Sequence, residues 1–172
     1  MSKIAIYPGT FDPIHYGHMD IAERASRLFD EIVIAVYDKP IKTLFFSPEE
    51  RIALVEQAVA SNPKIRVTGY SGLTVEYARK VNAQVIVRGL RVFSDFEFEF
   101  RMALANHRLS PDIEYMALIT AEEHTFLSST TVREIASLGG DVSSMVPPYV
   151  EEALKKTLVD MEDKDIPNAL RD

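Results

Sequence analysis

The chain contains no cysteine, no long apolar run and fewer basic than acidic residues, and each shortage excludes a class of protein. Without cysteine, disulfides and thiolate catalysis are impossible, and the composition fits a reducing compartment. With 19 basic and 26 acidic residues the net charge is −7, which argues against general binding to nucleic acid. No apolar segment reaches the length of a membrane span, and the N-terminus lacks a signal-peptide pattern. We therefore expect a soluble, cytoplasmic protein that binds neither nucleic acid nor membrane.

The length and the apolar content indicate a single folded unit. The 172 residues, 47% of them hydrophobic, suffice for one domain with a sizeable core. The sequence has no internal repeat, no low-complexity segment and no linker that would divide it. The prediction is one domain over residues 1–160, followed by a polar, acidic tail over 161–172 whose composition permits disorder.

The segment Tyr7–His18 is the first candidate for a ligand site. A short apolar run at 4–7 precedes it, and apolar residues with helical spacing follow it. A strand, a loop and a helix in this order direct backbone N–H groups and a positive helix end toward the loop. Gly9 and Gly17 permit close approach of a ligand, and Thr10 adds a hydroxyl. Two readings remain open: a phosphate site, or an ordinary turn beside surface histidines.

Apolar, β-branched runs alternate with helical segments along the whole chain. Strands are expected at 4–7, 32–37, 65–70, 84–88 and 115–119. Helices are expected around 21–28 and at 48–61, 74–81, 94–109, 129–138 and 148–159. This alternation predicts an α/β fold: a doubly wound, parallel, five-stranded sheet with helices on both faces.

Serine residues mark three of the expected helix starts. Ser47 with Glu50 has the spacing of a capping box, and so has Ser94 with Glu97. Ser128 or Ser129 is expected to cap the helix that ends at Gly139-Gly140.

Polar and basic side chains follow the expected strands, where ligands bind in open parallel sheets. They are Thr10, His18, Lys42, Thr74, Arg88, Arg91 and the run Ser128, Ser129 and Thr130. Arginine suits bidentate phosphate contacts, and hydroxyls at a helix start suit a second anion. Each residue also has a plain structural reading, such as a solvated lysine or a serine cap. Together, however, they predict a polyphosphate substrate.

The sequence offers no covalent nucleophile. It lacks the Gly-x-Ser-x-Gly elbow, the P-loop pattern and a Gly-x-Gly-x-x-Gly after the first strand. His15 and His18 have no third ligand nearby in sequence, so a zinc site is not expected. The mechanism that remains is positioning and charge stabilisation with the substrate itself as nucleophile, as is common in phosphoryl-type transfer.

Two separated motifs resemble a known superfamily. His15-Tyr16-Gly17-His18 resembles the His/Thr-x-Gly-His signature of the nucleotidyltransferases, and residues 127–133, Leu-Ser-Ser-Thr-Thr-Val-Arg, resemble their Ile-Ser-Ser-Thr-x-Ile-Arg signature. Tyr-Pro-Gly-Thr-Phe-Asp-Pro at 7–13, Arg-Gly-Leu-Arg at 88–91 and Asp-Phe-Glu-Phe-Glu at 95–99 further resemble the bacterial phosphopantetheine adenylyltransferase family. The similarity covers roughly residues 3–158.

The resemblance implies a reaction, its partners and its residues. Members transfer the adenylyl group of ATP to 4′-phosphopantetheine, giving dephospho-coenzyme A and pyrophosphate. Mg²⁺ is expected on the ATP phosphates and not on protein side chains. Members are usually hexamers, and coenzyme A can act as a feedback inhibitor. The implied residues are, for catalysis, His18, Lys42 and Arg91; for ATP, Thr10, Phe11, His18, Gly89, Leu90, Arg91, Glu99, His124, Thr125, Phe126, Leu127, Ser128, Ser129 and Thr130; and for the acceptor, Thr10, Lys42, Leu73, Thr74 and Arg88.

Three positions depart from the family pattern. His15 replaces a frequent threonine, His124 stands where tyrosine or tryptophan is common, and Thr74 replaces a larger apolar residue.

Two rival functions also remain. One is a related transferase with another acceptor, such as a nicotinate mononucleotide adenylyltransferase or a glycerol-phosphate cytidylyltransferase. The other is a non-catalytic module that senses ATP.

Overall fold

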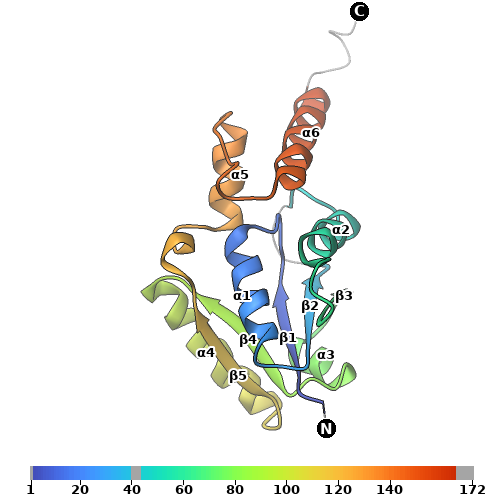
Figure 1. The fold of residues 1–172 in the computed structure, drawn as a ribbon, viewed down its shortest axis with the longest axis vertical. Helices are drawn as coiled ribbons and strands as arrows, with labels where there is room; N and C mark the ends of the chain where they lie inside the picture. Colours follow the sequence, from blue (N-terminus) through green and yellow to red (C-terminus); the bar gives the residue numbers. More distant parts are fainter. Residues whose placement is uncertain (1, 40–43, 166–172) are drawn as a thin grey trace, which may run out of the picture.

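The fold is built on one parallel sheet of five strands, seen in a computed structural model that describes residues 2–39 and 44–165 (Figure 1). The strand order is β3-β2-β1-β4-β5, and every neighbouring pair is parallel. The strands are β1 Ile4–Gly9, β2 Glu31–Tyr37, β3 Ile65–Tyr70, β4 Val85–Leu90 and β5 Glu114–Ile119. All five expected strands are therefore confirmed.

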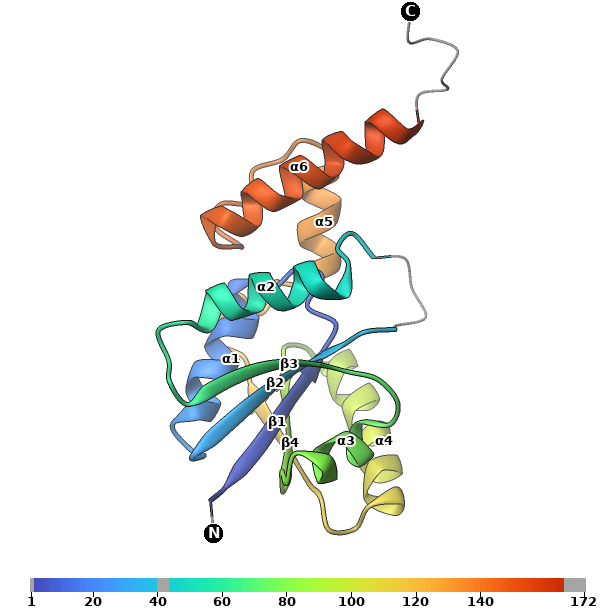
Figure 2. The same ribbon diagram turned by 90° about the vertical axis from the view of Figure 1, so that its right-hand side faces the viewer.

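Helices cover both faces of this sheet (Figure 2). They are α1 Tyr16–Ser26, α2 Pro48–Val59, α3 Thr74–Lys80, α4 Phe93–Leu109, the 3₁₀ turn η1 Glu122–His124, α5 Ser129–Ser137 and α6 Pro148–Asp165. In β1, Ala5 and Tyr7 pack with α1 and α2, whereas Ile6 packs with α3 on the opposite face. This alternation is what a strand buried on both faces requires, and it confirms the doubly wound α/β fold.

The chain reverses its direction of winding beside β1. It adds β2 and then β3 on one side of β1, and afterwards crosses to add β4 and β5 on the other side. The carboxyl ends of β1 and β4 therefore diverge into separate loops at the middle of the sheet. In such sheets this switch point is the place where a ligand binds.

Two of the three predicted helix caps are present in the structure. Ser47 and Glu50 form the expected capping box, with the Glu50 Oε2 2.8 Å from the Ser47 backbone nitrogen. Ser128 caps α5, since its side chain accepts a bond from the Thr131 backbone N–H at 3.0 Å. The capping box at Ser94 is wrong, because α4 begins one residue earlier with Val92 as its N-cap.

The last helix is longer than the sequence predicted. It continues past Val159 to Asp165, so the start of the expected tail is helical. Residues 160–164 contain good helix formers and no breaker, which favours this continuation. Figures 1 and 2 show α5 and α6 beyond the carboxyl edge of the sheet. Among the described residues, no helix is long and apolar enough to span a membrane.

Candidate active site

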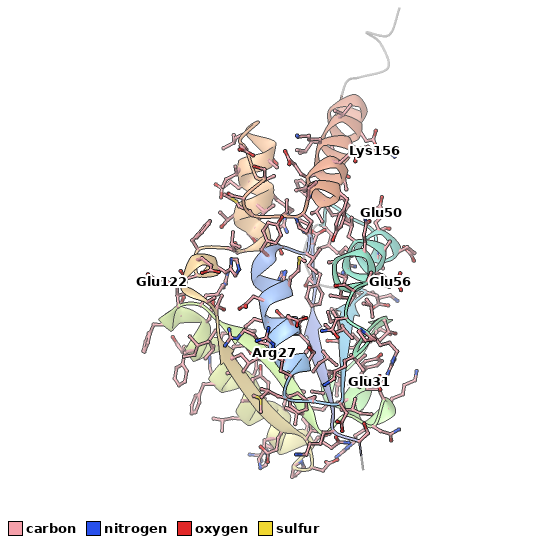
Figure 3. The ribbon with its side chains drawn as sticks, viewed as in Figure 1. Arg27, Glu31, Glu50, Glu56, Glu122 and Lys156 are labelled. Atoms are coloured by element: carbon pink, nitrogen blue, oxygen red, sulfur yellow. The ribbon has the colours of Figure 1, made fainter. Side chains whose placement is uncertain are left out.

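A cavity of about 380 Å³ lies at the carboxyl ends of β1 and β4, at the switch point of the sheet. Of the residues expected from sequence, it is lined by Thr10, Phe11, His18, Arg88, Gly89, Arg91, Glu99, His124, Ser128, Ser129 and Thr130. Two arginines, Arg88 and Arg91, and two carboxylates, Asp95 and Glu99, are the charged side chains that line it, beside histidine and hydroxyl groups. Other acidic side chains, such as Glu50, Glu56 and Glu122, are exposed and point outward from α2 and η1 (Figure 3).

The loop after β1 forms one wall of the cavity. Phe11 has a left-handed backbone with φ of 51°, and its ring is buried. A Cβ at Gly9 would lie 2.9 Å from the Phe11 ring, so only glycine lets the loop fold back this closely. The ring of Phe11 also meets the ring of His18 edge-on, with centroids 4.9 Å apart. Local sequence therefore fixes the position of His18 before any ligand binds.

His18 is held by the first turn of α1. Its Nδ1 accepts the backbone N–H of His15 at 3.3 Å, and its own backbone N–H reaches the His15 Nδ1 at 3.3 Å. The two imidazole rings stack with centroids 3.6 Å apart. Because Nδ1 is an acceptor, a neutral His18 ring carries its proton on Nε2. The ring can therefore donate a hydrogen bond from Nε2 to an oxygen atom of a ligand.

His15 is a buried neutral group. Burial, with smaller effects from the charges of Arg91 and His124, lowers the pKa of His15 to about 3. At neutral pH the ring is therefore uncharged, as its role as hydrogen-bond acceptor at the helix start requires. His15 thus supplies the N-cap of α1.

Arg88 is oriented by a carboxylate at the cavity wall. Its Nε and Nη2 donate to Glu99 Oε1 at 2.9 and 2.7 Å, and its Nη1 donates to the Pro8 carbonyl. Burial alone would lower the pKa of Arg88, but hydrogen bonds and charge from Glu99 raise it above its ordinary value. Among the described residues these bonds use three of the five guanidinium N–H groups. One N–H on Nη1 and one on Nη2 remain, which is the arrangement for a bidentate phosphate contact.

Arg91 ties the loop after β4 to the segment before α5. Its Nε and Nη2 donate to the two oxygens of Asp95 at 2.9 and 3.1 Å, and its Nη1 donates to the Leu127 carbonyl at 2.6 Å. Partial burial opposes ionisation of Asp95, yet the bonds from Arg91 hold the pKa of this carboxyl below its usual value. The guanidinium therefore has a fixed orientation at the cavity.

The second motif docks directly onto the first. The Ser129 hydroxyl donates to the Pro13 carbonyl at 2.8 Å, although 116 residues separate them. Arg133 lies 3.3 Å from the buried carboxylate of Asp12. The amino end of α5 is thereby held at the cavity, where helix N–H groups favour anions.

Comparison with known proteins agrees with this arrangement. The model of the cytidylyltransferase-like family matches residues 6–135, a span that includes both motifs. The phosphopantetheine adenylyltransferase of Roseiflexus sp. (strain RS-1) is 55% identical over 153 residues, which cover 89% of this chain and 96% of the relative. The enzyme of the same name from Herpetosiphon aurantiacus is 53% identical, with 89% and 93% covered. The chain belongs to the phosphopantetheine adenylyltransferase family. The resemblance seen in the sequence is thus confirmed.

A solved structure supports the fold of this adenylyltransferase. The nicotinic acid mononucleotide adenylyltransferase of Plasmodium falciparum, complexed with NaAD, superposes with a TM-score of 0.68. The match covers 91% of this chain and 96% of that chain, at 18% identity. At that identity the likeness speaks for the architecture alone.

Several expected residues of the adenylyltransferase do not line the cavity. Four of them lie in the same segments as residues that line the cavity, but are not themselves among its lining residues: Leu90, Thr125, Phe126 and Leu127. Leu127 is fully buried, and its carbonyl accepts the bond from Arg91, so it supports the site from behind. Phe126 is instead exposed.

The expected acceptor-side residues are further from the cavity. Leu73 is exposed at the start of α3, and the Thr74 hydroxyl lies 3.0 Å from the Tyr70 hydroxyl. Both follow β3 at the edge of the sheet, two strands away from β1. Lys42 lies outside the described residues.

Sequence reasoning missed four residues that build the site from behind the cavity. Arg51, Asp12 and Arg133 join distant segments, and Tyr115 donates to Glu99. Arg133 stands within the second motif, which is the one signal that could have indicated it. Arg51 and Tyr115 look like ordinary helix and strand residues, and their partners lie 41 and 16 residues away.

Proposed function

We propose that the protein transfers the adenylyl group of ATP to 4′-phosphopantetheine, releasing pyrophosphate and dephospho-coenzyme A. The observation that carries the proposal is the convergence of His18, Arg88, Arg91 and Ser129 on one cavity, in a chain of this family. These groups come from four separate segments. Their meeting favours a substrate with several phosphates, because the arginine and histidine side chains and the backbone N–H groups at the amino end of α5, where Ser129 lies, can donate to anionic oxygen.

The reaction is a direct displacement. An oxygen of the acceptor phosphate attacks the α-phosphorus of ATP, the new P–O bond forms, and the bond to the β-phosphate bridge breaks. The electron pair leaves with pyrophosphate, and no covalent enzyme intermediate is formed. His18 donates from Nε2 to the oxygens around the α-phosphorus, where negative charge is redistributed in the transition state.

The acceptor phosphate is held by Arg88 through its two remaining N–H groups, together with Thr10 and Lys42. Leu73 and Thr74 contact the pantetheine arm. ATP is bound by the loop 9–11, the segment 88–91 and the amino end of α5, with Arg91 on its phosphates. Two anionic substrates repel each other in water, and the cations at the cavity reduce this repulsion.

Magnesium enters as part of the nucleotide substrate. In the described part of the chain, no group of three or more acidic, histidine or cysteine residues could hold a metal ion. Glu99 and Asp95, the carboxylates at the cavity, are already bonded to Arg88 and Arg91. Mg²⁺ would take phosphate oxygens of ATP as ligands and would further lower the charge of the nucleotide.

Exposed apolar side chains on α4 support an assembly of several chains, which we propose to be a homohexamer. Single exposed apolar residues are ordinary, but a cluster of them on one helix marks an interaction surface. The cluster comprises Phe93, Phe96, Phe98, Phe100, Met102, Leu104 and Leu109.

Coenzyme A, which contains the product, is proposed as a feedback inhibitor that binds at the active-site cavity. The proposed location of the protein is the cytoplasm.

An acceptor screen tests the function. Pyrophosphate release is measured with ATP or CTP against phosphopantetheine, nicotinate mononucleotide and glycerol 3-phosphate, each with Mg²⁺. Release is expected only with ATP and phosphopantetheine, and with formation of dephospho-coenzyme A. Turnover with another pair, or with none, would overturn the proposal. EDTA in excess over Mg²⁺ should stop the reaction, since the nucleotide then loses its cation.

A further inference from the structure

Arg51 is a fully buried arginine on α2 whose donors reach only main-chain carbonyls. Its Nη1 donates to the carbonyls of Thr10 and Tyr37 at 2.8 and 2.7 Å. Its Nε donates to the Phe46 carbonyl at 3.2 Å, and its Nη2 lies 3.4 Å from the Asp38 carbonyl. A buried cation is costly unless its donors are satisfied, and here carbonyl oxygens satisfy them.

Three of the four carbonyls, those of Thr10, Tyr37 and Asp38, lie where the neighbouring strands β1 and β2 separate. The ladder between β1 and β2 ends with Gly9 opposite Val36, and Thr10 and Tyr37 are the next residues. Beyond this point the strands no longer pair with each other, so their carbonyls need other donors. Arg51 supplies them and joins the end of β1, the end of β2 and the residue before the α2 cap.

A second buried group strengthens the same junction. The Asp12 carboxylate, 1% exposed, accepts the backbone N–H groups of Phe45 and Phe46 at 3.0 Å each. Phe46 is therefore held from both sides, by Asp12 at its nitrogen and by Arg51 at its oxygen. The loop after β1, which forms one wall of the cavity, is thus tied to the end of β2 and to the start of α2 by side chains that do not line the cavity.

The contacts of Arg51 are confined to one side of the site. They include Thr10, which lines the cavity, but no residue of β4, η1 or α5. Thr10 is one of three proposed contacts of the acceptor phosphate. For ATP it is one of many, and most of the others, among them Arg91, His124 and Ser129, lie on elements that Arg51 does not contact. A disturbance at Arg51 should therefore weaken binding of the acceptor phosphate more than binding of the nucleotide.

We propose that Arg51 is a positioning residue for the acceptor phosphate, acting through the backbone of Thr10 and the end of β2. The inference rests on the proposed function and adds a residue that does not touch either substrate. It predicts an asymmetric defect: loss of Arg51 weakens use of phosphopantetheine and leaves use of ATP nearly unchanged.

Arg51→Lys and Arg51→Gln are the test variants, because both retain a donor but cannot reach four carbonyls at once. Initial rates are measured with either substrate varied and the other saturating. Arg51→Lys should raise the KM for phosphopantetheine about tenfold and the KM for ATP less than about twofold. Arg66→Lys is the matched control, since Arg66 is half exposed on β3 and pairs with Glu31 at 2.9 Å, and neither KM should change.

A double-mutant cycle separates positioning from general loss of structure. If Arg51 acts through Thr10, the double variant Thr10→Ala/Arg51→Lys should lose less kcat/KM for the acceptor than the product of the fold-losses of the two single variants. Two results would overturn the inference: a double variant whose fold-loss equals that product, or equal changes in both KM values with a lower Tm. If the wild-type protein shows no adenylyl transfer, the proposed function is overturned as well. If the wild type is active and Arg51→Lys has unchanged KM values, this inference alone is overturned.

Discussion

Arg88 on β4 and Glu99 on α4 form an ion pair with 2.7 Å between Nη2 and Oε1, at the wall of the cavity. Glu99 is almost fully buried and also accepts a hydrogen bond from the Tyr115 hydroxyl on β5. The hydrogen-bonded series Tyr115, Glu99, Arg88 therefore runs from the edge strand β5 to the cavity. Resemblance assigns Glu99 to ATP, but in this structure its oxygens are occupied by protein donors.

Removal of the Tyr115 hydroxyl tests this relay. Tyr115→Phe should raise the KM for phosphopantetheine about threefold, because one bond to a charged group is lost and Arg88 gains freedom. The KM for ATP should stay within experimental error. Tyr149→Phe on α6 is the matched control, since its buried hydroxyl has no described hydrogen-bond partner. Equal behaviour of the two variants would count against the relay.

His18→Ala tests the catalytic role of the imidazole. Loss of one donor to the transition state should lower kcat by about 10²–10³-fold. Affinity for ATP, measured by calorimetry, should change little, because the amino end of α5 and Arg91 remain. His107→Ala removes an exposed histidine of α4 and should leave kcat unchanged. If His18→Ala retained full activity, a nucleotide-sensing module would be the better description.

The parts of the structure that sequence predicted depend on local patterns. The five strands are apolar runs that need burial on both faces, and Ser47 with Glu50 is a self-contained capping box. The cavity was also predictable, because carboxyl ends of parallel strands meet at one edge and two motifs fall there. The sequence predicts too early an end for α6, because the polar, acidic composition of residues 161–172 favours disorder, whereas the helix continues to Asp165.

The parts that sequence did not predict depend on distant partners. Arg51 bonds to carbonyls, and every residue offers a carbonyl, so no side-chain pattern reveals the contact. The start of α4 is a different case, because the competing contact is local. Ser94 has the spacing of a capping box, yet Asp95 accepts the backbone N–H of Arg91, four residues away, and α4 starts one residue earlier.

The ion pair of Asp12 with Arg133 should contribute strongly to stability. Arg133→Met leaves the buried Asp12 carboxylate without its cation and should lower the free energy of unfolding by about 3 kcal/mol. Urea denaturation measures the change. Arg101→Met is the control, since the Arg101–Glu97 pair is exposed, and its effect should stay within about 0.5 kcal/mol. A second substitution, Asp12→Asn, should recover part of the loss in Arg133→Met, and failure to do so would argue against charge pairing.

The buried His15 gives a stability that depends on pH. Its pKa is lowered to about 3 in the folded protein, whereas an unfolded histidine titrates near 6.5. Between these values the unfolded chain binds a proton that the folded chain does not. Stability is therefore fully present above pH 6.5 and falls as the pH drops toward 3, by up to about 1.4 kcal/mol per pH unit.

His15→Thr should remove this contribution and keep the cap, because threonine is also a good N-cap acceptor. Free energies of unfolding from urea denaturation, taken between about pH 7.5 and about pH 4.5, should fall more steeply for the wild type than for the variant. His107→Thr is the control, since His107 is exposed on α4 and its removal should leave the slope unchanged. Parallel curves for the wild type and His15→Thr would mean that His15 is protonated in the folded protein, and a charged ring could not accept the His18 backbone N–H.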